Sequence, residues 1–519
     1  MTSPLRAWQH ETLRALAGWQ DGPFLIAAAP GAGKTRPALE FAKSLLDTRR
    51  ASSVAVVCPT TPLTRQWAAA AADAGVQLVP DAASPQLPSD FDGVAVTYAR
   101  IASDPERWAK GVSPGTLVIA DEAHHLGEEL AWGLGFARAF RAAPRWLLLS
   151  GTPFRSDATP IPGVRYDVDG LAQPDISYAY CDAVRDGVCR PVGFVTYDGT
   201  LSWRSGEDVI ESTFEDVLPA REASRRYRTA ISTDLPAGLA RILAQAHVKL
   251  VELRGGEHPG AGGLFVAADT AHARRLAGLL REATGRAPVV VLHTDARAPE
   301  KLRRFAAGRE PWIVAVNMVS EGVDIPRLRV GVYATAAKTP LIFRQIVGRF
   351  VRTIPGRPAT PSWLYLPADP VLRTHAGAIE SELRAALKPD QPLEPRELRL
   401  RTSDEPCEEF VPLLADVAPQ LTLFGGPAPA AASAVALAEP QAPPHPRTPS
   451  SFERRAQLRD ERRRLVSEVR RVDGRAHREV NAWLNRELGL RSVNDATLDQ
   501  LELSVELLVR ELTRKRRAR

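Results

Sequence analysis

Short apolar runs rich in β-branched residues alternate with stretches of helical periodicity along most of this chain. Strands of a parallel sheet give such continuous runs, because helices cover both faces of the sheet. The runs form two series, at 24–29, 53–58, 93–98, 116–121 and 145–150 and then at 263–268, 288–293, 312–317, 329–334 and 363–368. The alternation therefore predicts an α/β protein with two parallel-sheet domains.

The stretch between the two series is less regular and is rich in Asp, Gly and Pro, which is typical of a connector. Residues 425–450 are Pro- and Ala-rich and predict a semi-extended linker. We expect a first domain at 1–160, a connector at 161–235, a second domain at 236–400, a linker at 401–450 and a basic helical tail at 451–519.

The composition, 44% apolar and 25% charged, is typical of a soluble globular protein. No apolar run approaches the roughly 18 residues of a membrane span, and the first residues lack a hydrophobic signal core. The cysteines Cys58, Cys181, Cys189 and Cys407 have no metal-ligand spacing. We therefore expect a cytoplasmic protein without membrane association.

The basic residues are mostly arginine, and the abundance of Ala indicates a codon bias, so arginine content alone is weak evidence for nucleic acid. Their placement is more informative. Residues 451–519 hold 18 Lys and Arg against 12 Asp and Glu, which accounts for the whole net charge of +6.

Residues 28–35 read AAPGAGKT and lie between a predicted strand and a predicted helix. Gly31 and Gly33 allow backbone N–H groups to face phosphate oxygens, and Lys34 then reaches the terminal phosphates. The hydroxyl of Thr35 is suited to Mg²⁺. Ala28 departs from the strict pattern, which has Gly there, and a plain glycine-rich turn is the alternative.

The apolar stretch TLVIADEAHHL ends in two adjacent carboxylates, Asp121 and Glu122. A buried strand has little reason to end in paired acids unless a cation lies there. At a nucleotide site Asp121 holds Mg²⁺, and Glu122 orients and deprotonates the attacking water. A solvated strand end is the alternative. His124 and His125 lack nearby partners for a zinc site.

The stretches AAPGAGKT and DEAH resemble motifs I and II of the superfamily 2 helicases and translocases, whose motif I tolerates Ala at its first position. Other stretches are similar to the remaining motifs in the expected order, namely 5–13 (the adenine-reading segment), 58–67 (Ia), 96–100 (Ic), 149–155 (III), 315–326 (V) and 345–352 (VI). The resemblance covers about residues 1–400. It implies two tandem RecA-like domains that bind ATP and Mg²⁺ between them. It says nothing about the tail, whose own pattern predicts a small helical C-terminal extension.

Hydrolysis at such a site needs positive charge opposite the phosphate loop, since negative charge spreads over the transferred oxygens. The resemblance to motif VI implies that Arg349 and Arg352 supply it, with Gln345 beside them. In an arginine-rich chain the alternative is ordinary surface charge. The other roles that the resemblance implies are adenine recognition by Gln9, lining of the cleft by Gly322 and Asp324, and coupling of the two activities by His124, Ser150 and Thr152.

The resemblance also implies contacts with a nucleic-acid backbone, from Thr60, Arg65 and Thr97 in the first domain and from Ser320 and the segment Phe265–Asp269 in the second. Contacts of this kind reach phosphates and carry little sequence information. Thr60 and Thr97 are equally suited to cap helices at strand ends.

The segment 175–199 resembles the connector of DNA translocases in the XPB-like, RadD-like and restriction-subunit-like branches, and Trp8–Gln9 points the same way. We therefore expect an ATP-dependent DNA helicase or translocase. An RNA helicase, or a nucleotide-driven clamp that remodels a protein partner, is the alternative. We find no nuclease constellation of Asp and Glu-x-Lys.

The tail reads as three amphipathic helices, over about 452–474, 478–489 and 497–512, with a basic end. Thr497 and Gln500 form a capping-box pair at the start of the last helix, and Gly489 is suited to end the second. We expect either a small bundle that tethers DNA or a protein partner, or a helical hairpin that packs on the second domain.

Overall fold

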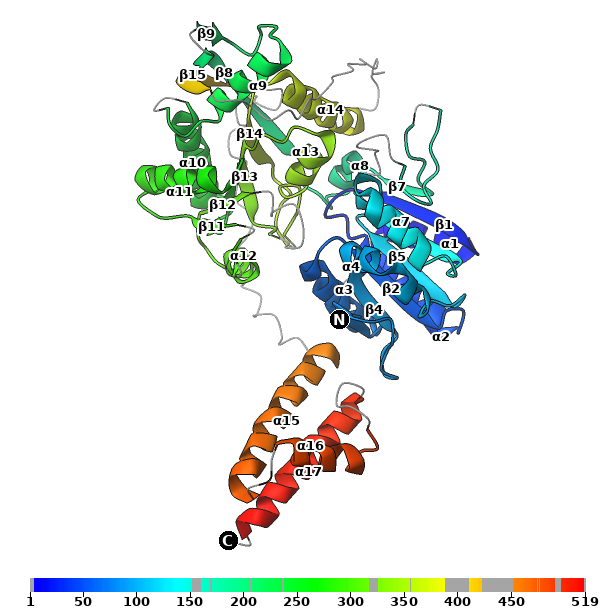
Figure 1. Ribbon diagram of the computed structural model, residues 1–519. Helices are drawn as coiled ribbons and strands as arrows, with labels where there is room; N and C mark the ends of the chain where they lie inside the picture. Colours follow the sequence, from blue (N-terminus) through cyan, green and yellow to red (C-terminus); the bar gives the residue numbers. More distant parts are fainter. Residues whose placement is uncertain are drawn as a thin grey trace.

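The computed structural model of the chain describes residues 4–151, 160–168, 170–205, 208–235, 238–292, 294–295, 297–316, 325–354, 356–387, 410–421, 451–473, 475, 477–490 and 496–517. Figure 1 shows two α/β bodies and, beyond them, a group of three helices. Among the described residues, no helix has both the length and the apolar character needed to cross a membrane.

The first body contains a sheet of seven parallel strands in the order β3-β4-β2-β5-β6-β1-β7. Its central strands are buried on both faces, as their continuous apolar runs predict. The strands are β1 (Gly22–Ala28), β2 (Ser53–Cys58), β3 (Leu78–Pro80), β4 (Gly93–Thr97), β5 (Thr116–Asp121), β6 (Arg145–Ser150) and β7 (Ile176–Tyr178).

The helices of this body connect the strands and cover the sheet (Figure 1). Parallel neighbours need such crossovers, because each strand must return to the same edge before the next one starts. The helices are α1 (Ala7–Gly18), α2 (Thr35–Asp47), α3 (Thr61–Ala74), α4 (Tyr98–Ser103), α5 (Pro105–Ala109), α6 (His125–Glu128), α7 (Leu130–Ala139) and α8 (Tyr180–Arg185).

The second body contains an eight-stranded sheet with the path β11-β12-β10-β13-β14-β8-β15 and with β9 paired to β8. The core is parallel, while β9 and β15 run antiparallel to β8. The strands are β8 (Val192–Ser205), β9 (Asp208–Ser212), β10 (Gly262–Ala267), β11 (Val289–Val291), β12 (Trp312–Val316), β13 (Leu328–Ala334), β14 (Ser362–Pro367) and β15 (Val411–Leu421). The helices are α9 (Ala220–Ala230), α10 (Leu239–Gly255), α11 (Thr270–Thr284), α12 (Ala298–Ala307), α13 (Pro340–Val347) and α14 (Pro370–Leu387).

These two sheets confirm the predicted fold class, and each apolar run of the two series contains a strand. The segment 161–235, expected to be a connector, contributes strands to both sheets, because β7 pairs with β1 while β8 pairs with β14. The limits given above for the separate domains remain a proposal.

The prediction of a linker throughout 401–450 is wrong for Val411–Leu421, which forms β15 and pairs with residues 195–204 of β8. This strand contains Pro412 and Pro419, although proline cannot donate a ladder hydrogen bond. A sheet edge tolerates proline, because one side of an edge strand forms no ladder hydrogen bonds, and β15 lies at the edge. The Pro- and Ala-rich stretch 425–450 lies outside the described residues.

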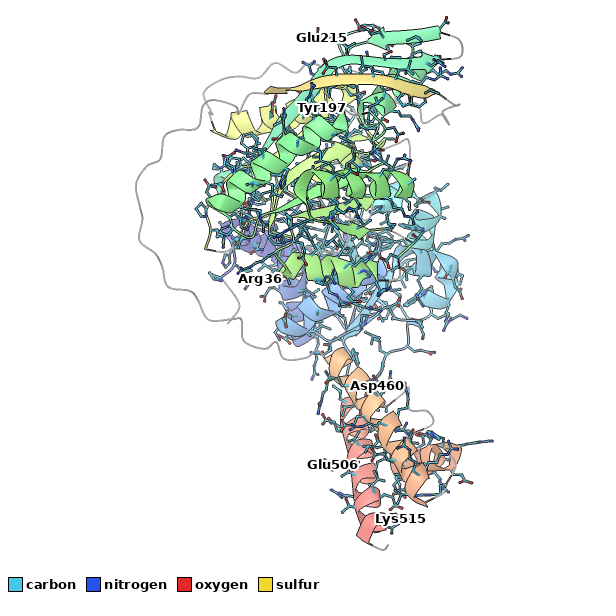
Figure 2. All side chains as sticks on the ribbon, turned by 90° about the vertical axis from the view of Figure 1, so that its left-hand side faces the viewer. Arg36, Tyr197, Glu215, Asp460, Glu506 and Lys515 are labelled. Atoms are coloured by element: carbon cyan, nitrogen blue, oxygen red, sulfur yellow. The ribbon has the colours of Figure 1, made fainter. Side chains whose placement is uncertain are left out.

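The tail forms the three predicted helices, α15 (Ser451–Asp473), α16 (His477–Glu487) and α17 (Leu498–Arg517), around a small apolar core. The capping box is confirmed, since Thr497 N donates to Gln500 Oε1 at 2.9 Å and Gln500 N donates to Thr497 Oγ1 at 3.3 Å. Gly489 has a left-handed φ of 65° just after α16. Figure 2, which labels Asp460 and Glu506 on the bundle, shows it extending away from both sheets.

The tail contacts the first domain, so the alternative of packing on the second domain is wrong. The guanidinium of Arg455 pairs with the carboxylate of Asp90 and lies 4.6 Å from the centroid of the Phe91 ring. Leu498 N donates to Asp90 Oδ2 at 3.1 Å. Asp90, which lies between β3 and β4, thus binds the first turns of both α15 and α17.

Candidate active site

The loop after β1 has the backbone of a phosphate cradle. Gly31 and Gly33 have φ values of 81° and 86°, a left-handed conformation that side chains disfavour. Helix α2 begins at Thr35, so the positive end of its dipole faces this loop. Lys34 is 9% exposed, and its Nζ donates to Ala28 O at 3.0 Å.

The two acids follow at the end of β5, which lies between β2 and β6. The carboxylate of Asp121 is held from both sides: Trp67 Nε1 donates to Oδ2 at 2.7 Å, and Glu122 N donates to Oδ1 at 3.1 Å. The hydroxyl of Tyr98 donates to Asp121 O at 2.7 Å. Glu122 has a φ of 50°, which is uncommon for a residue with a side chain and is typical of functional turns.

The surroundings move the pKa values of the two acids in opposite directions. Burial, and then the charge of Glu122, raises the pKa of Asp121 to about 6, although Trp67 and Lys34 act the other way. Burial also acts to raise the pKa of Glu122, but the positive charges of Lys34, His124, His125 and Arg349 outweigh it, so the pKa of Glu122 is lowered.

The two domains meet at a cavity of about 320 Å³. A Cβ placed on Gly31 would lie 3.3 Å from Arg352 Cγ, so this arginine lies directly against the phosphate loop. The cavity therefore unites the predicted phosphate loop, both acids and both arginines. Its lining residues are Pro30, Gly31, Gly33, Lys34, Thr35, Leu63, Gln66, Asp121, Glu122 and Gly151 from the first domain and Gln345, Gly348, Arg349 and Arg352 from the second.

We call the boundary between the two domains at this cavity the seam. A chain of polar contacts crosses the seam through His124, which is 3% exposed. His124 Nδ1 lies 3.1 Å from Ser150 Oγ and 3.5 Å from Glu122 Oε2. Its other nitrogen, Nε2, lies 3.3 Å from Gln345 Nε2 of the second domain. His124, Ser150 and Gln345, expected from the sequence to couple or line the site, are therefore in contact.

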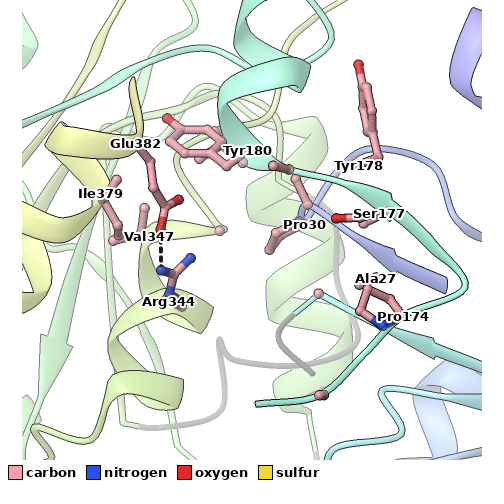
Figure 3. A pocket seen from close by; sticks show the side chains of 17 residues that line it. Ala27, Pro30, Pro174, Ser177, Tyr178, Tyr180, Arg344, Val347, Ile379 and Glu382 are labelled. Atoms are coloured by element: carbon pink, nitrogen blue, oxygen red, sulfur yellow. Dashed lines mark hydrogen bonds and ion pairs between the residues drawn. The ribbon is translucent and has the colours of Figure 1, made fainter. Parts of the chain in front are cut away.

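A second cavity of about 280 Å³ adjoins the seam and shares Pro30, Gly151 and Gly348 with the first (Figure 3). The dashed line in Figure 3 marks the ion pair between Arg344 and Glu382, with Nη2 and Oε1 2.5 Å apart. This pair joins α13 to α14 and so fixes the helix that precedes Gly348 and the two arginines.

The segment at 5–13 lies against the phosphate loop. Arg6 Nη1 donates to Ala32 O at 2.6 Å, and Gln9 Nε2 donates to Gly33 O at 3.0 Å. Gln9 Oε1 accepts from Arg6 N at 2.9 Å, so both ends of this carboxamide are engaged within the protein. Gln9 is 3% exposed and does not line the seam cavity. Its role in reading adenine remains a prediction.

The residues expected to contact nucleic acid differ in how accessible they are. Arg65 is exposed on α3, whereas Thr60 Oγ1 is buried. Thr97 Oγ1 accepts from Arg100 N at 3.3 Å and so caps α4, which is the alternative that the sequence left open. In the second domain Phe265 is fully buried, and Asp269 caps α11 by accepting from His272 N at 2.8 Å.

Four predicted residues, Thr152, Ser320, Gly322 and Asp324, lie outside the described residues, so their roles stay predictions. Other contacts at the site were not expected from the sequence. Trp67 reads as an ordinary core residue of an amphipathic helix, yet it binds Asp121. Cys189 forms an antiparallel bridge with Arg352, and Arg190 N donates to Val351 O at 2.7 Å, so the connector holds the segment with the two arginines.

The residues at the seam fit a nucleotide and its metal ion. Lys34 is a buried ammonium beside two glycines whose backbone leaves room for phosphate oxygens. The hydroxyl of Thr35 and the carboxylate of Asp121 are hard oxygen donors of the kind that Mg²⁺ prefers. In the described part of the chain, no group of three or more His, Cys, Asp or Glu side chains is placed to hold a metal. One carboxylate with substrate phosphates is the usual arrangement for Mg²⁺.

Comparison with protein families gives two matches, and they fall on the two sheets. A family described as the res subunit of type III restriction enzymes matches residues 2–155. A family described as the helicase conserved C-terminal domain matches residues 249–353. The first stretch contains the phosphate loop and both acids, and the second ends just after Arg352.

Similar proteins occur in mycobacteria. A protein of Mycobacterium tuberculosis described as uncharacterised is 43% identical over 388 residues, which cover 73% of this chain and 63% of that protein. One of Mycobacterium leprae, also described as uncharacterised, is 38% identical over 442 residues, covering 82% of this chain and 73% of that protein. The chain thus spans less than two thirds of the length of the first relative.

Among solved structures, an ATP-dependent type ISP restriction-modification enzyme bound to DNA aligns with a TM-score of 0.49 and 15% identity, over 74% of this chain and 30% of that one.

Proposed function

Because this chain belongs to superfamily 2 of the helicases, we propose that it hydrolyses ATP at the seam between its two sheets and uses the resulting domain movement to travel along DNA. The observation that carries the proposal is the seam cavity, which Lys34, Glu122 and Arg352 line together. The first domain contributes the glycines and the acids of this cavity, and the second domain contributes the arginines, so the complete site exists only where the two domains meet.

Each side of the cavity has a chemical task in this proposal. Lys34 and the N–H groups around Gly31 and Gly33 bind the phosphates, while Thr35 and Asp121 would hold Mg²⁺, which neutralises phosphate charge when bound. Glu122, whose lowered pKa keeps it ionised, takes the proton of the attacking water.

The second domain completes the site. Arg349 and Arg352 stabilise the charge that develops on the transferred phosphoryl group. Both domains contact this phosphoryl group while ATP is bound. When hydrolysis releases it, that shared contact is lost and the domains separate. His124, which touches Ser150, Glu122 and Gln345, links this change to both domains.

Nucleic acid is the proposed track, held mainly through phosphates. Exposed Arg65 on α3 supports a contact in the first domain. We favour DNA over RNA because the segment 175–199 resembles the connector of DNA translocases. Among the residues proposed for this role, Thr97 serves first as a helix cap.

The test is the ATPase rate of the full chain with single-stranded DNA, duplex DNA and RNA of matched length, and without nucleic acid. We expect strong stimulation by DNA and little by RNA. Stimulation by RNA alone would assign the enzyme to RNA, and equal rates in all conditions would favour a protein-remodelling switch. Lys34→Ala, which removes the phosphate-binding ammonium, is the inactive control.

The seam itself is tested by Arg352→Ala. Because an arginine at this position acts mainly in the transition state, we expect kcat to fall by about 10³-fold while the affinity for ATP changes little. Equilibrium binding of a fluorescent ATP analogue and steady-state hydrolysis separate the two effects. A large loss of affinity with an unchanged rate would remove Arg352 from this role.

A further inference from the structure

The carboxylate of Asp121 is bound by a tryptophan that belongs to another element. Trp67 lies on α3, is 2% exposed, and its Nε1 donates to Asp121 Oδ2 at 2.7 Å. A buried indole N–H needs a partner, and here the partner is the acid rather than a backbone carbonyl.

Helix α3 also reaches the two places where the proposed function puts its ligands. Its residues Leu63 and Gln66 line the seam cavity. Arg65 is exposed to solvent, whereas Trp67, two positions later and about 200° around the helix, faces inwards. A rigid helix therefore has the proposed nucleic-acid contact on one side and the donor to Asp121 on the other.

We propose that Trp67 is a positioning residue that couples α3 to the carboxylate of Asp121, so that a shift of α3 on nucleic-acid binding sets the orientation of this acid toward Mg²⁺. The inference rests on the proposed function, since the orientation of Asp121 matters only if this acid holds Mg²⁺ beside ATP.

An indole N–H is chemically suited to this task. A carboxylate rotates broadly about its last torsion unless a donor holds it. A lysine or arginine in the place of Trp67 would hold it, but its charge would compete with the metal ion. The neutral N–H fixes Oδ2 and leaves the negative charge for Mg²⁺, as the outer hydrogen bonds of metal sites commonly do.

The test variant is Trp67→Phe, which keeps an aromatic ring and removes the N–H. The first readout is binding of a fluorescent, non-hydrolysable ATP analogue with and without Mg²⁺. Without Mg²⁺, we expect the variant to bind the analogue with the wild-type affinity. The factor by which Mg²⁺ increases this affinity should be about 10- to 100-fold smaller in the variant than in the wild type. The second readout is ATP hydrolysis, where stimulation by single-stranded DNA should fall while DNA affinity stays the same.

Trp19→Phe is the matched control. Trp19 is 8% exposed in the same domain, and its Nε1 donates to Asp21 O at 2.7 Å, a backbone carbonyl. Removal of the Trp19 indole N–H should leave the Mg²⁺ dependence of analogue binding unchanged. Replacement of Trp67 by 3-benzothienylalanine, which has a sulfur in place of the N–H at nearly the same volume, gives the same comparison if Trp67→Phe does not fold.

The outcomes separate this inference from the proposed function. If DNA stimulates the wild-type enzyme and the Trp67 variants keep the wild-type Mg²⁺ dependence and stimulation, the coupling role is wrong and the proposed function stands. If the wild-type enzyme is not stimulated, the proposed function fails and the coupling fails with it. Equal losses with and without Mg²⁺ would show a structural role only and would also overturn the inference.

Discussion

Asp121 and Glu122 are neighbours in the chain, yet their surroundings give them different acidities. Asp121 is the more deeply buried, and its pKa rises to about 6, whereas positive groups on both sides of the seam lower the pKa of Glu122. Adjacent carboxyl groups whose pKa values are driven apart commonly divide the tasks of a site between them. The assignment of Mg²⁺ binding to Asp121 and of the base to Glu122 follows the proposed function, in which both carboxylates line the seam cavity beside Lys34.

At this scale we expect Glu122→Gln to bind ATP as the wild type does and to lose turnover by about 10²-fold or more, because the amide cannot take a proton from water. Nucleotide binding at equilibrium and single-turnover hydrolysis measure the two effects. Turnover that survives intact would show that Glu122 is not the base.

His258 provides a prediction about acid stability. It is 4% exposed, and burial followed by the charges of Arg357, Arg329, Arg190 and Arg327 lowers its pKa to about 4. Its Nδ1 lies 3.5 Å from Arg329 Nη1 and can accept a hydrogen bond only when neutral. The unfolded chain binds the proton near pH 6.5. Stability therefore falls as the pH drops from about 6.5 toward 4.

Replacing the imidazole by a side chain that never titrates should weaken this dependence. We expect His258→Asn to show a smaller drop in melting temperature between pH 7.5 and pH 5 than the wild type shows. Equal drops in both proteins would mean that His258 is protonated in the folded state over this range. His10, which is exposed, provides the matched control as His10→Asn.

At the scale of elements, the second sheet depends on a strand that joins it from far along the chain. β15 pairs antiparallel with β8 over Val411–Leu421, and Ala415 and Val417 are 1% and 0% exposed. β8 in turn pairs with β14. Residues 411–421 are thus part of the second domain rather than a tether.

Val417→Asp should lower the free energy of unfolding of this domain by at least about 3 kcal/mol, because it buries an unpaired charge. Leu414→Asp, on the same strand but at a position 43% exposed, should have little effect. Thermal unfolding of both variants decides the point. Equal stability of the two would mean that β15 does not pack against β8.

For the whole molecule, the tail is attached at a site where three side chains meet. Arg455 is 3% exposed and is paired with Asp90 over the ring of Phe91. Since Asp90 belongs to the first domain, we infer that the basic bundle moves with the phosphate loop rather than with the two arginines of the seam. DNA or a protein partner held by the tail would then follow the first domain.

Arg455→Ala should release this attachment, because Asp90 and Phe91 lose the same partner. We expect amide hydrogen exchange at about residues 88–92 and at the start of α17 to rise by about tenfold or more. Arg454→Ala is the control, as Arg454 pairs with Glu502 within the tail. An equal exchange rate in both variants would contradict the attachment.

Much of this protein follows from the sequence alone, because local patterns have local causes. The strands of both series, the turn at Gly31 and Gly33, the start of α2 at Thr35 and the capping box at Thr497 depend on periodicity, backbone conformation and neighbouring side chains. A single stretch of chain contains the information for each of them.

Contacts between distant segments needed the tertiary structure. The sequence does not reveal that β15 completes the second sheet, that Arg455 docks on Asp90, or that Trp67 binds Asp121. An apolar or basic side chain can pack against many different segments of the same chain. Which segment it contacts depends on how the whole chain packs. The resemblance implied that the two arginines lie opposite the phosphate loop, whereas the cavity that they line together is a feature of the folded chain.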